Sequence, residues 1–435
     1  MREKVVLIGA GSAMFTRGLV ADVIRQGWEG ELALVDIDPS ALEVAEKIAR
    51  KMLASVNSPI TVSASTDRRD LLKNATVVIC TIAVGGRRGW ELDVHIPRKY
   101  GIFQPVGDSV MPGGTSRALR MIPPMVAIAQ DVLDLAPQAL FFNYGNPMGP
   151  VCRAVRKATG ANMVGLCHGV NQVARRIASE LKCSEDQLRY TAVGMNHLTW
   201  FTEVRVDAVD AISRLKQIAR ENLRSISETD IPFTWQLVDL FGAFPAVLDR
   251  HICEFFPHMF KHEGSYFGKT LGVDAFDHSF SIDRGNRLFE EMREDALSPD
   301  PLPADYFEKI EGEHEQVTEI IASIRRDEGR IFSANLPNRG QVPNLPSEAI
   351  VESPCIADAG GVRPITLPPM PSALAGTLAS RFQWVETTVE AALEGSKEKF
   401  VQALLIDGAV DSVDMARKLA DDLLEAQKEY LPNFI

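Results

Sequence analysis

The chain contains 435 residues, of which 46% are hydrophobic and 24% are charged, and its formal net charge is −12. These proportions are ordinary for a folded globular protein, and a length beyond about 300 residues predicts either one large domain with a substantial second lobe or two closely packed domains. The acidic balance argues against nucleic acid or an anionic membrane as a partner, because both require a clustered positive face. The first residues lack a signal-peptide pattern and no stretch of about 18 apolar residues follows, so we expect a cytoplasmic protein.

Short β-rich runs alternate with helical patterns in the amino-terminal part of the chain, which is typical of parallel βαβ units. The expected strands are Lys4–Gly9, Glu31–Asp36, Ile60–Ala64, Thr76–Ile82, Ala139–Tyr144 and Met163–Leu166. Six such strands predict an α/β protein with a doubly wound, Rossmann-type sheet. We assign residues 1–195 to this dinucleotide-binding domain, and residues 196–435 to an α+β lobe for substrate, metal and subunit contacts.

Two helical segments stand out further along the chain. Arg117–Leu135 has the pattern of an amphipathic helix, and we expect Pro123 and Pro124 to interrupt it near its start. Near the carboxyl terminus, apolar residues at helical spacing form a stripe that favours a core or subunit face. Its members are Val413, Ala416, Leu419, Ala420, Leu423 and Leu424.

The segment VVLIGAGSAMF places Gly9 and Gly11 at the end of the first expected strand, where a helix begins. Gly9 allows a tight turn, and Gly11 lets backbone N–H groups approach a pyrophosphate at the helix N-terminus. Met14 stands where the general fingerprint has a third glycine. Asp36, which ends the second strand, predicts an acceptor for a ribose 2′-OH and favours NAD over NADP. The alternative is a glycine-rich turn that binds no nucleotide, with Asp36 a solvated strand end.

Three short motifs lie at or near strand ends, where ligands gather in an open α/β sheet. Asn146 stands in FFNYGNPMG, Cys167 and His168 in VGLCHG, and Asn196 and His197 in VGMNH. A cysteine thiolate and a neutral imidazole suit a borderline divalent ion, and the separation between Cys167 and His197 permits them to converge. The alternative for each is a side chain that fills the core.

Together with GAGS and Phe15, these motifs in this order resemble glycoside hydrolase family 4, over most of the chain. The resemblance implies a fold similar to lactate and malate dehydrogenases, a homodimer or homotetramer, and NAD⁺ with a divalent ion, usually Mn²⁺, as cofactors. The residues that it implies are Cys167 and His197 as metal ligands, His168 as general acid, Asn146 as a contact to sugar hydroxyls near the nicotinamide, and Gly9, Gly11, Ser12, Phe15 and Asp36 at the dinucleotide.

The implied reaction oxidises C3 of the sugar with NAD⁺, removes the C2 proton and expels the leaving group from C1, while the metal polarises the sugar oxygens. Water then adds, and the hydride returns from NADH to C3, so that the cofactor is recycled in each turnover. Asp249, in FGAFPAVLDRHICEFFP, is the expected base and His251 its rival. Asp249 could instead be a surface carboxylate paired with Arg250. Asp108, on the loop FQPVGDSVMPGG, is expected to touch substrate or metal-bound water, or else to be a turn residue.

The loop QPVGDSVMPGGTSRALRMIP resembles the uronidase and α-galactosidase branch of the family. A uronate carboxylate would require a bidentate arginine, for which we expect Arg87 or Arg250, with Arg88 and Arg117 also nearby. Asn196 is expected to contact the sugar. We therefore expect an α-glucuronidase or α-galacturonidase first, then a neutral α-glucosidase or α-galactosidase, then a 6-phospho-glycosidase.

Two other classes of protein compete with this interpretation. A lactate- or malate-type 2-hydroxy-acid dehydrogenase would share the fold and release NADH, but it has no need for the pair formed by Cys167 and His197. A non-enzymatic NAD-binding regulator would keep the fold without its chemistry, because fold does not establish activity.

Overall fold

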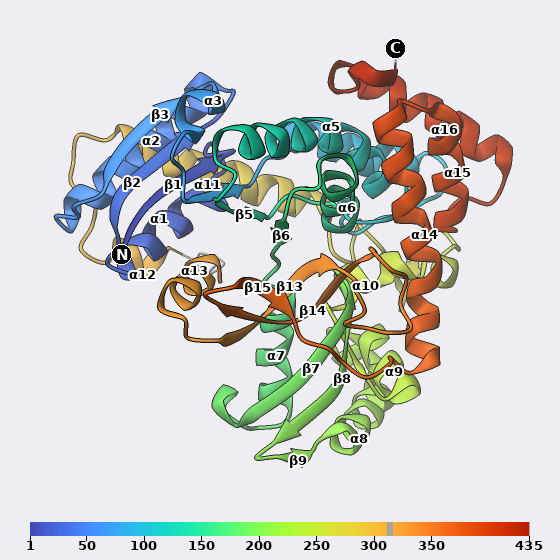
Figure 1. The fold of residues 1–435 in the computed structure, drawn as a ribbon. Helices are drawn as coiled ribbons and strands as arrows, with labels where there is room; N and C mark the ends of the chain where they lie inside the picture. The colour runs from blue at the N-terminus through green and yellow to red at the C-terminus, as the bar shows by residue number, and fades with distance from the viewer. Residues whose placement is uncertain (311–315, 435) are drawn as a thin grey trace.

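A computed structural model describes residues 1–310 and 316–434. Each of the six predicted strands forms. They are β1 (Arg2–Ile8), β2 (Glu29–Val35), β3 (Thr61–Ser65), β4 (Val77–Cys80), β5 (Leu140–Asn143) and β6 (Met163–Gly165). All are parallel, in the order β3-β2-β1-β4-β5-β6, which is the strand order of a doubly wound dinucleotide-binding sheet. The α/β prediction of Rossmann type is confirmed (Figure 1).

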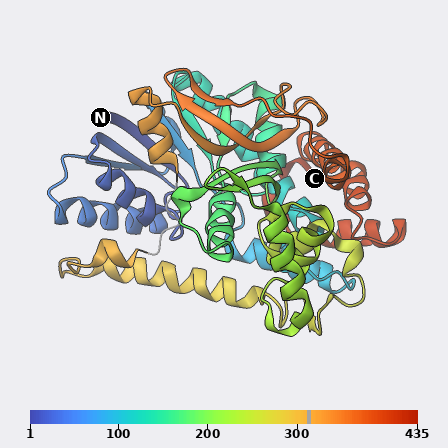
Figure 2. The same ribbon diagram turned by 90° about the horizontal axis from the view of Figure 1, so that it is seen from below.

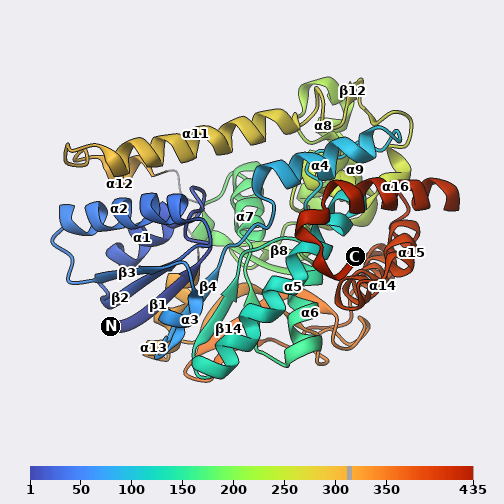
Figure 3. The ribbon, with the colours of Figure 1, turned by 90° about the horizontal axis from the view of Figure 1, so that it is seen from above.

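Helices cover both faces of the parallel sheet, which explains why its central strands β1 and β4 are apolar on both faces. Val5 and Leu7 of β1 pack into the cluster that includes α1 (Thr16–Arg25) and α2 (Pro39–Ser55). Val6 and Ile8 pack on the opposite face, in the cluster that includes α5 (Met111–Leu135) and α6 (Met148–Thr159). A long helix, α11 (His278–Leu297), lies alongside α2 on the outside (Figures 2 and 3).

The sheet continues beyond β6 with antiparallel strands from the second half of the chain. In order from β6 these are β13 (Arg330–Pro337), β14 (Ile350–Asp358), β7 (Leu188–Met195), β8 (Leu198–Val206) and β10 (Phe244–Ala246). As a result, two strands from late in the sequence lie between β6 and β7, although β6 and β7 follow each other along the chain (Figure 1).

The remaining elements frame this sheet. The other described helices are α3 (Arg68–Leu72), α4 (Gly86–Arg98), α7 (Gly169–Glu180), α8 (Ile212–Asn222), α9 (Pro232–Phe241), α10 (Asp249–Phe255), α12 (Tyr306–Lys309), α13 (Val317–Arg326), α14 (Ser372–Glu394), α15 (Lys397–Asp407) and α16 (Val413–Ala426). The other described strands are β9 (Val209–Asp210), β11 (Ser265–Tyr266), β12 (Lys269–Thr270) and β15 (Gly361–Pro364). Among the helices of residues 1–310 and 316–434, none has both the length and the apolar character needed to cross a bilayer.

The expected interruption of the helix at Pro123 and Pro124 is wrong, because α5 runs without a break from Met111 to Leu135. The helix is long and packs against α4, α6, α14 and α15, so tertiary contacts stabilise it where proline removes backbone donors. The carboxyl-terminal stripe forms α16, and its residues Ala416, Leu419 and Leu423 are buried within this chain against α15 and α4.

Candidate active site

The glycine turn between β1 and α1 leaves no space for side chains. Gly9 has a φ of +93°, and a Cβ there would lie 2.8 Å from the backbone nitrogen of Ile82. A Cβ on Gly11 would lie 2.6 Å from the Cβ of Ala41. The Gly11 N–H donates to Asp36 Oδ2 at 2.7 Å, so the carboxylate at the end of β2 fixes the turn at the end of β1.

The other residues expected at the dinucleotide lie beside this turn. The carbonyl oxygen of Ser12 accepts from the N–H of Thr16, which begins α1, and Phe15 precedes that helix. The ring of Phe15 lies 5.4 Å from that of Tyr144, between centroids. Asp36 is half-buried, and its Oδ1 accepts from the N–H of Asp38 at 3.0 Å.

A groove between α1 and α11 opens beside the turn. It is lined by Ala13 and Met14 and by four basic side chains with one acidic one. The charged residues are Arg17, Arg284, Arg287, Lys309 and Glu291. Such an excess of positive charge beside a helix N-terminus suits a phosphate-bearing ligand.

Cys167 and His197 come together although two strands lie between β6 and β7. Cys167 Sγ lies 3.6 Å from His197 Nε2. His197 occupies the two-residue turn between β7 and β8, with a φ of +67°, which is uncommon for a residue with a side chain. On its other side, His197 Nδ1 lies 2.6 Å from Ser109 Oγ, so this hydroxyl orients the ring.

Asp108 and His251 complete a cluster around His197. Potential ligand atoms of Asp108, His197 and His251 all lie within 4.8 Å of one another. The rings of His197 and His251 are 4.3 Å apart, between centroids. Asn146 joins the cluster because its Nδ2 donates to Asp108 Oδ2 at 3.1 Å. Thiolate, imidazole and carboxylate donors thus meet at one place, which is a donor set for a divalent ion.

Burial and local charge set the protonation states of the cluster. Burial lowers the pKa of His197 to about 4, against the attraction of Asp108. Burial also holds the pKa of His251 well below its usual value, and the neighbouring His197 adds to this effect. Burial opposes ionisation of Asp108, but His197, His251 and Arg117 together lower its pKa below the usual value. Near pH 7 the site therefore holds neutral imidazoles beside an ionised carboxylate.

Asp249 lies elsewhere and has other partners. Its carboxylate accepts from the N–H groups of Phe233 and Thr234 at 2.8 and 2.7 Å, at the start of α9, and from the Tyr266 hydroxyl at 2.5 Å. The side chain is fully buried, so the alternative of a surface carboxylate is wrong. These bonds occupy both oxygens and tie α9 to α10. Its rival His251 is the residue of this segment that the fold brings to His197.

The remaining predicted residues divide between the cluster and other places. His168 directly precedes α7 and lies close enough to help lower the pKa of both His197 and His251. The positive charge of Arg250 also lowers the pKa of these two histidines, and its guanidinium donates to Ser281 Oγ at 2.7 Å.

Other predicted side chains point to different partners. Asn196 donates to Glu352 Oε2 at 3.2 Å. Arg87 is exposed and lies over the ring of Phe289 on α11. Arg117 is largely buried, and its Nε donates to the carbonyl oxygen of Asn146 at 3.1 Å, which places it nearer the cluster than Arg87.

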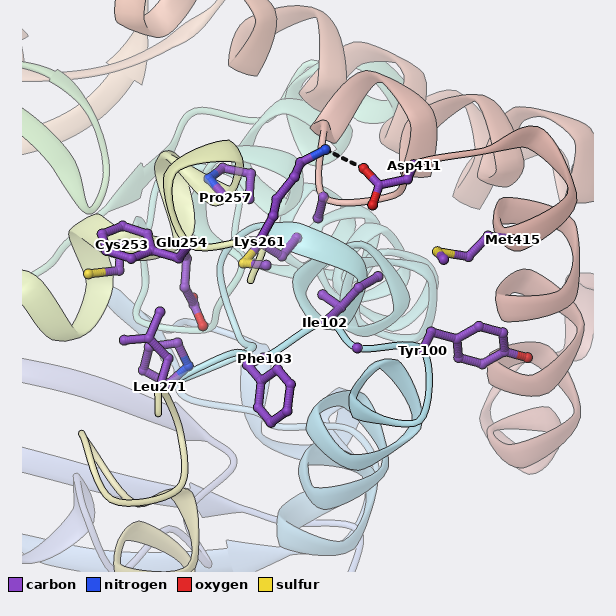
Figure 4. Close-up of a pocket in the computed structure, with 15 residues that line it drawn as sticks. Tyr100, Ile102, Phe103, Cys253, Glu254, Pro257, Lys261, Leu271, Asp411 and Met415 are labelled. Carbon is purple, nitrogen blue, oxygen red and sulfur yellow. Dashed lines mark hydrogen bonds and ion pairs between the residues drawn. The ribbon is translucent and has the colours of Figure 1, made fainter. Parts of the chain in front are cut away.

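Helix α10 also holds the loop that carries Asp108. Glu254 accepts from the N–H groups of Val106 and Gly107 at 2.8 and 2.7 Å, and burial raises its pKa to about 8. Glu254 lines a pocket between α10 and the loop after α4, with the ion pair of Lys261 and Asp411 also in its wall (Figure 4). Within the part of the chain that the structure describes, none of the predicted site residues lines this pocket.

Two contributors to the site were not predicted. Ser109 directly follows Asp108, so a closer reading of the same loop could have found it. Glu352 lies on β14, more than 150 residues beyond Asn196, and no local signal in the sequence connects the two.

Comparison with known proteins agrees with this geometry. Residues 4–183 match the family 4 glycosyl hydrolases, and residues 192–410 match the carboxyl-terminal domain of that family. The chain belongs to glycoside hydrolase family 4. The family resemblance predicted from the motifs is thereby confirmed, and with it the prediction of a glycosidase.

Family 4 relatives at similar identity differ in their substrates. The chain is 34% identical to an α-glucosidase from Erwinia rhapontici, with 99% of each chain covered. It is 30% identical to an α-galactosidase from Bacillus subtilis, covering 99% of this chain and 100% of that one. It is also 30% identical to an α-galacturonidase from Bacillus subtilis, with 97% of each covered. Identity at this level leaves the sugar open.

Solved structures share the fold. A 6-phospho-α-glucosidase from gut microorganisms, solved in complex with NAD and Mn²⁺, superposes with a TM-score of 0.83 over 100% of both chains at 20% identity. Malate dehydrogenase from Plasmodium falciparum, in complex with NADH, gives a TM-score of 0.50 at 14% identity over 90% of this chain and 98% of that one. The predicted similarity to the malate dehydrogenase fold is thus confirmed.

Proposed function

We propose that this family 4 member cleaves an α-glycoside with NAD⁺ and a divalent metal ion, and that its preferred substrate is an α-uronide. The observation that carries the proposal is the convergence of Cys167, His197, Asp108 and His251. A glycosidase with paired carboxylates would instead place two acidic side chains on either side of the scissile bond.

The turn between β1 and α1 fits a dinucleotide. Gly9 and Gly11 keep the backbone free of side chains where a pyrophosphate would approach, and the basic groove beside α1 would neutralise its charge. Asp36 at the end of β2 favours a ribose with a free 2′-OH, and so NAD⁺ over NADP⁺.

The cluster fits a divalent ion through Cys167 and His197. The lowered pKa of His197 keeps its imidazole neutral, and a tautomer that donates Nδ1–H to Ser109 Oγ leaves the Nε2 lone pair that faces Cys167 available to a metal. The bond of Nδ1 to Ser109 fixes the ring, as outer partners of metal-binding histidines commonly do. Asp108 adds a negative charge that balances the cation.

When bound, NAD⁺ supplies reversible hydride transfer at C3 of the sugar and the divalent ion supplies a Lewis acid for the adjacent oxygens. In our proposal His251 removes the C2 proton, since its imidazole is neutral and its buried Nδ1 has no partner among the described residues. His168, beside Cys167 at the start of α7, donates a proton to the departing oxygen on C1. Asn146, held by Asp108, would orient the sugar hydroxyls.

Arg250 and Arg117 are the proposed partners of a uronate carboxylate. Arg117 lowers the pKa of Asp108 and Arg250 lowers that of His197, so both charges lie close to the cluster. Arg87 instead packs on Phe289. A guanidinium can bind a carboxylate through two parallel hydrogen bonds, which a neutral sugar would not use.

The test compares p-nitrophenyl α-galacturonide, α-glucuronide, α-galactoside and α-glucoside, together with a 6-phospho-α-glucoside, while Mn²⁺ or NAD⁺ is omitted in turn. We expect cleavage that requires both cofactors, produces no net NADH and is fastest with a uronide. Fastest cleavage of a neutral or phosphorylated sugar would contradict the substrate proposal alone. Steady NADH release from a 2-hydroxy acid, without glycoside cleavage, would contradict the proposed reaction.

A further inference from the structure

One row of residues crosses the sheet between the strand that leads to Cys167 and the strand that leads to His197. Gly165 on β6 pairs with Asn335 on β13, Asn335 pairs with Glu352 on β14, and Glu352 pairs with Gly194 on β7. These four strands lie side by side in Figure 1. Gly165 lies two residues before Cys167, and Gly194 lies three residues before His197.

The middle of this row is polar and buried. Asn335 is 0% exposed and Glu352 is 1% exposed. Asn335 Nδ2 lies 3.4 Å from the carbonyl oxygen of Gly165. A Cβ on Gly165 would lie 2.9 Å from the Cβ of Asn335, so the glycine provides the space that this approach requires.

Glu352 binds both ends of the turn that presents His197. Its Oε2 accepts from Asn196 Nδ2 at 3.2 Å and from Thr199 Oγ1 at 2.8 Å. Asn196 directly precedes His197, and Thr199 follows two residues later. A single carboxylate oxygen therefore holds both ends of a turn in which His197 has a φ of +67°, a conformation that is unfavourable for a residue with a side chain.

Burying the Glu352 carboxylate costs free energy that packing alone would not justify. Burial raises the pKa of Glu352 to about 7, although the hydrogen bonds from Thr199 and Asn196 oppose that change. Its Oε1 is buried without a partner among the described residues, and so is Asn335 Oδ1. An apolar side chain at this position would avoid these costs if the strand only had to pack.

We propose that Glu352, with Asn335, is a positioning residue that sets the separation of Cys167 and His197 through a buried polar row across β6, β13, β14 and β7. Asn335 donates to the carbonyl of Gly165, strand pairing sets Asn335 beside Glu352, and Glu352 accepts hydrogen bonds from both ends of the turn at His197. Outer partners of this kind change metal affinity because they fix the ligands in the geometry that the ion requires. This inference rests on the proposed role of Cys167 and His197 as metal ligands.

The test measures Co²⁺ binding to the purified protein by calorimetry and by the thiolate-to-Co²⁺ absorption band, with NAD⁺ affinity measured in parallel. Glu352→Leu should weaken Co²⁺ binding by about 10- to 100-fold and diminish the thiolate band, while NAD⁺ affinity is unchanged. Glu352→Gln should restore most of the affinity, since an amide oxygen can still accept from Asn196 and Thr199. Ser353→Ala, a buried neighbour on β14, is the matched control.

Thr199→Val provides a second route to the same result, because it removes only one donor to Glu352 and leaves the carboxylate in place. We expect a smaller loss of Co²⁺ affinity, again without a change in NAD⁺ affinity. At least one of Glu352→Leu and Thr199→Val should fold. If the folded variant kept the Co²⁺ affinity and the thiolate band of the unmodified protein, the positioning role would be overturned. Two results would contradict the proposed function instead. They are no Co²⁺ binding by the unmodified protein, and equal Co²⁺ affinity of the unmodified protein and the Cys167→Ser variant.

Discussion

The dinucleotide turn and the metal cluster are built in opposite ways. The turn comes from one continuous segment, Gly9 to Phe15, fixed by a single carboxylate from the neighbouring strand. The cluster gathers side chains from four separate segments, at Asp108, Cys167, His197 and His251. The turn therefore depends on backbone shape, whereas the cluster depends on the relative placement of distant elements.

This difference separates the consequences of substitutions. A change in the cluster should remove metal binding and chemistry while the turn continues to bind NAD⁺. A change in the turn should weaken NAD⁺ binding while the metal affinity persists. The two sites therefore provide internal controls for each other.

The largest effect is expected for Cys167→Ser. Loss of the thiolate should lower divalent metal affinity by more than the roughly 10- to 100-fold that outer partners contribute, and activity should fall with it. Calorimetry with Mn²⁺ and NAD⁺ separately would measure this, with Cys183→Ser as the control for loss of a half-buried thiol. Undiminished Mn²⁺ affinity would show that the cluster holds no metal at this position.

A second prediction separates the two candidates for the base. His251→Asn should lower kcat by about 10²- to 10⁴-fold, because general base catalysis contributes on that scale. Asp249→Asn should instead lower the free energy of unfolding, by about 1 to 3 kcal/mol, because it disturbs bonds at the start of α9. Steady-state kinetics and urea unfolding of both variants distinguish the roles. The reverse pattern would make Asp249 the base.

The turn should respond more moderately to Gly11→Ala. The added Cβ would lie 2.6 Å from Ala41 and 2.8 Å from Asp36 Oδ2, so the turn must shift. Strain of about 1 to 3 kcal/mol corresponds to a roughly 5- to 150-fold weaker Kd for NAD⁺. Mn²⁺ affinity should not change. Gly376→Ala on α14, where a Cβ would meet nothing within 4 Å, is the control, and equal NAD⁺ affinity in both variants would contradict this view of the turn.

The smallest effect concerns pH and lies outside both sites. Burial lowers the pKa of His278 from 6.5 to about 4. Between these values the unfolded chain binds a proton that the folded chain does not, so stability falls as the pH is lowered from 6.5 toward 4. At pH 5 this should cost on the order of 1 to 2 kcal/mol, and His278→Phe should reduce the loss of stability by that amount, leaving the share that His197 and His251 contribute. Urea unfolding of both proteins at pH 7 and pH 5 measures this loss. An equal loss of unfolding free energy in His278→Phe and in the unmodified protein would contradict the prediction.

The same contrast explains what could be predicted from the sequence. The six parallel strands and the glycine turn were predictable because strand periodicity, glycine and a strand-end carboxylate act over short distances in the chain. The pair of Cys167 and His197 was predictable from donor chemistry and from the order of the family motifs, but not from local structure, since two strands from residues 330–358 separate β6 from β7.

Other features depend on long-range packing and could not be read locally. Asp249 and His251 lie two residues apart on α10, yet one binds α9 and the other faces His197. The direction in which each side chain points is set by how α10 packs on the sheet. Helix α5 continues through Pro123 and Pro124 for a similar reason, since its contacts with surrounding helices outweigh the local cost of proline.

The central claim is that glycoside cleavage proceeds through removal of the C2 proton. The most direct measurement runs the reaction in D₂O with Mn²⁺ and NAD⁺ and examines the product sugar by NMR. The proposed reaction predicts deuterium at C2 of the product, with incorporation lost in His251→Asn in parallel with kcat. A cleaved product that keeps its original hydrogen at C2 would contradict the claim and point to direct displacement at C1.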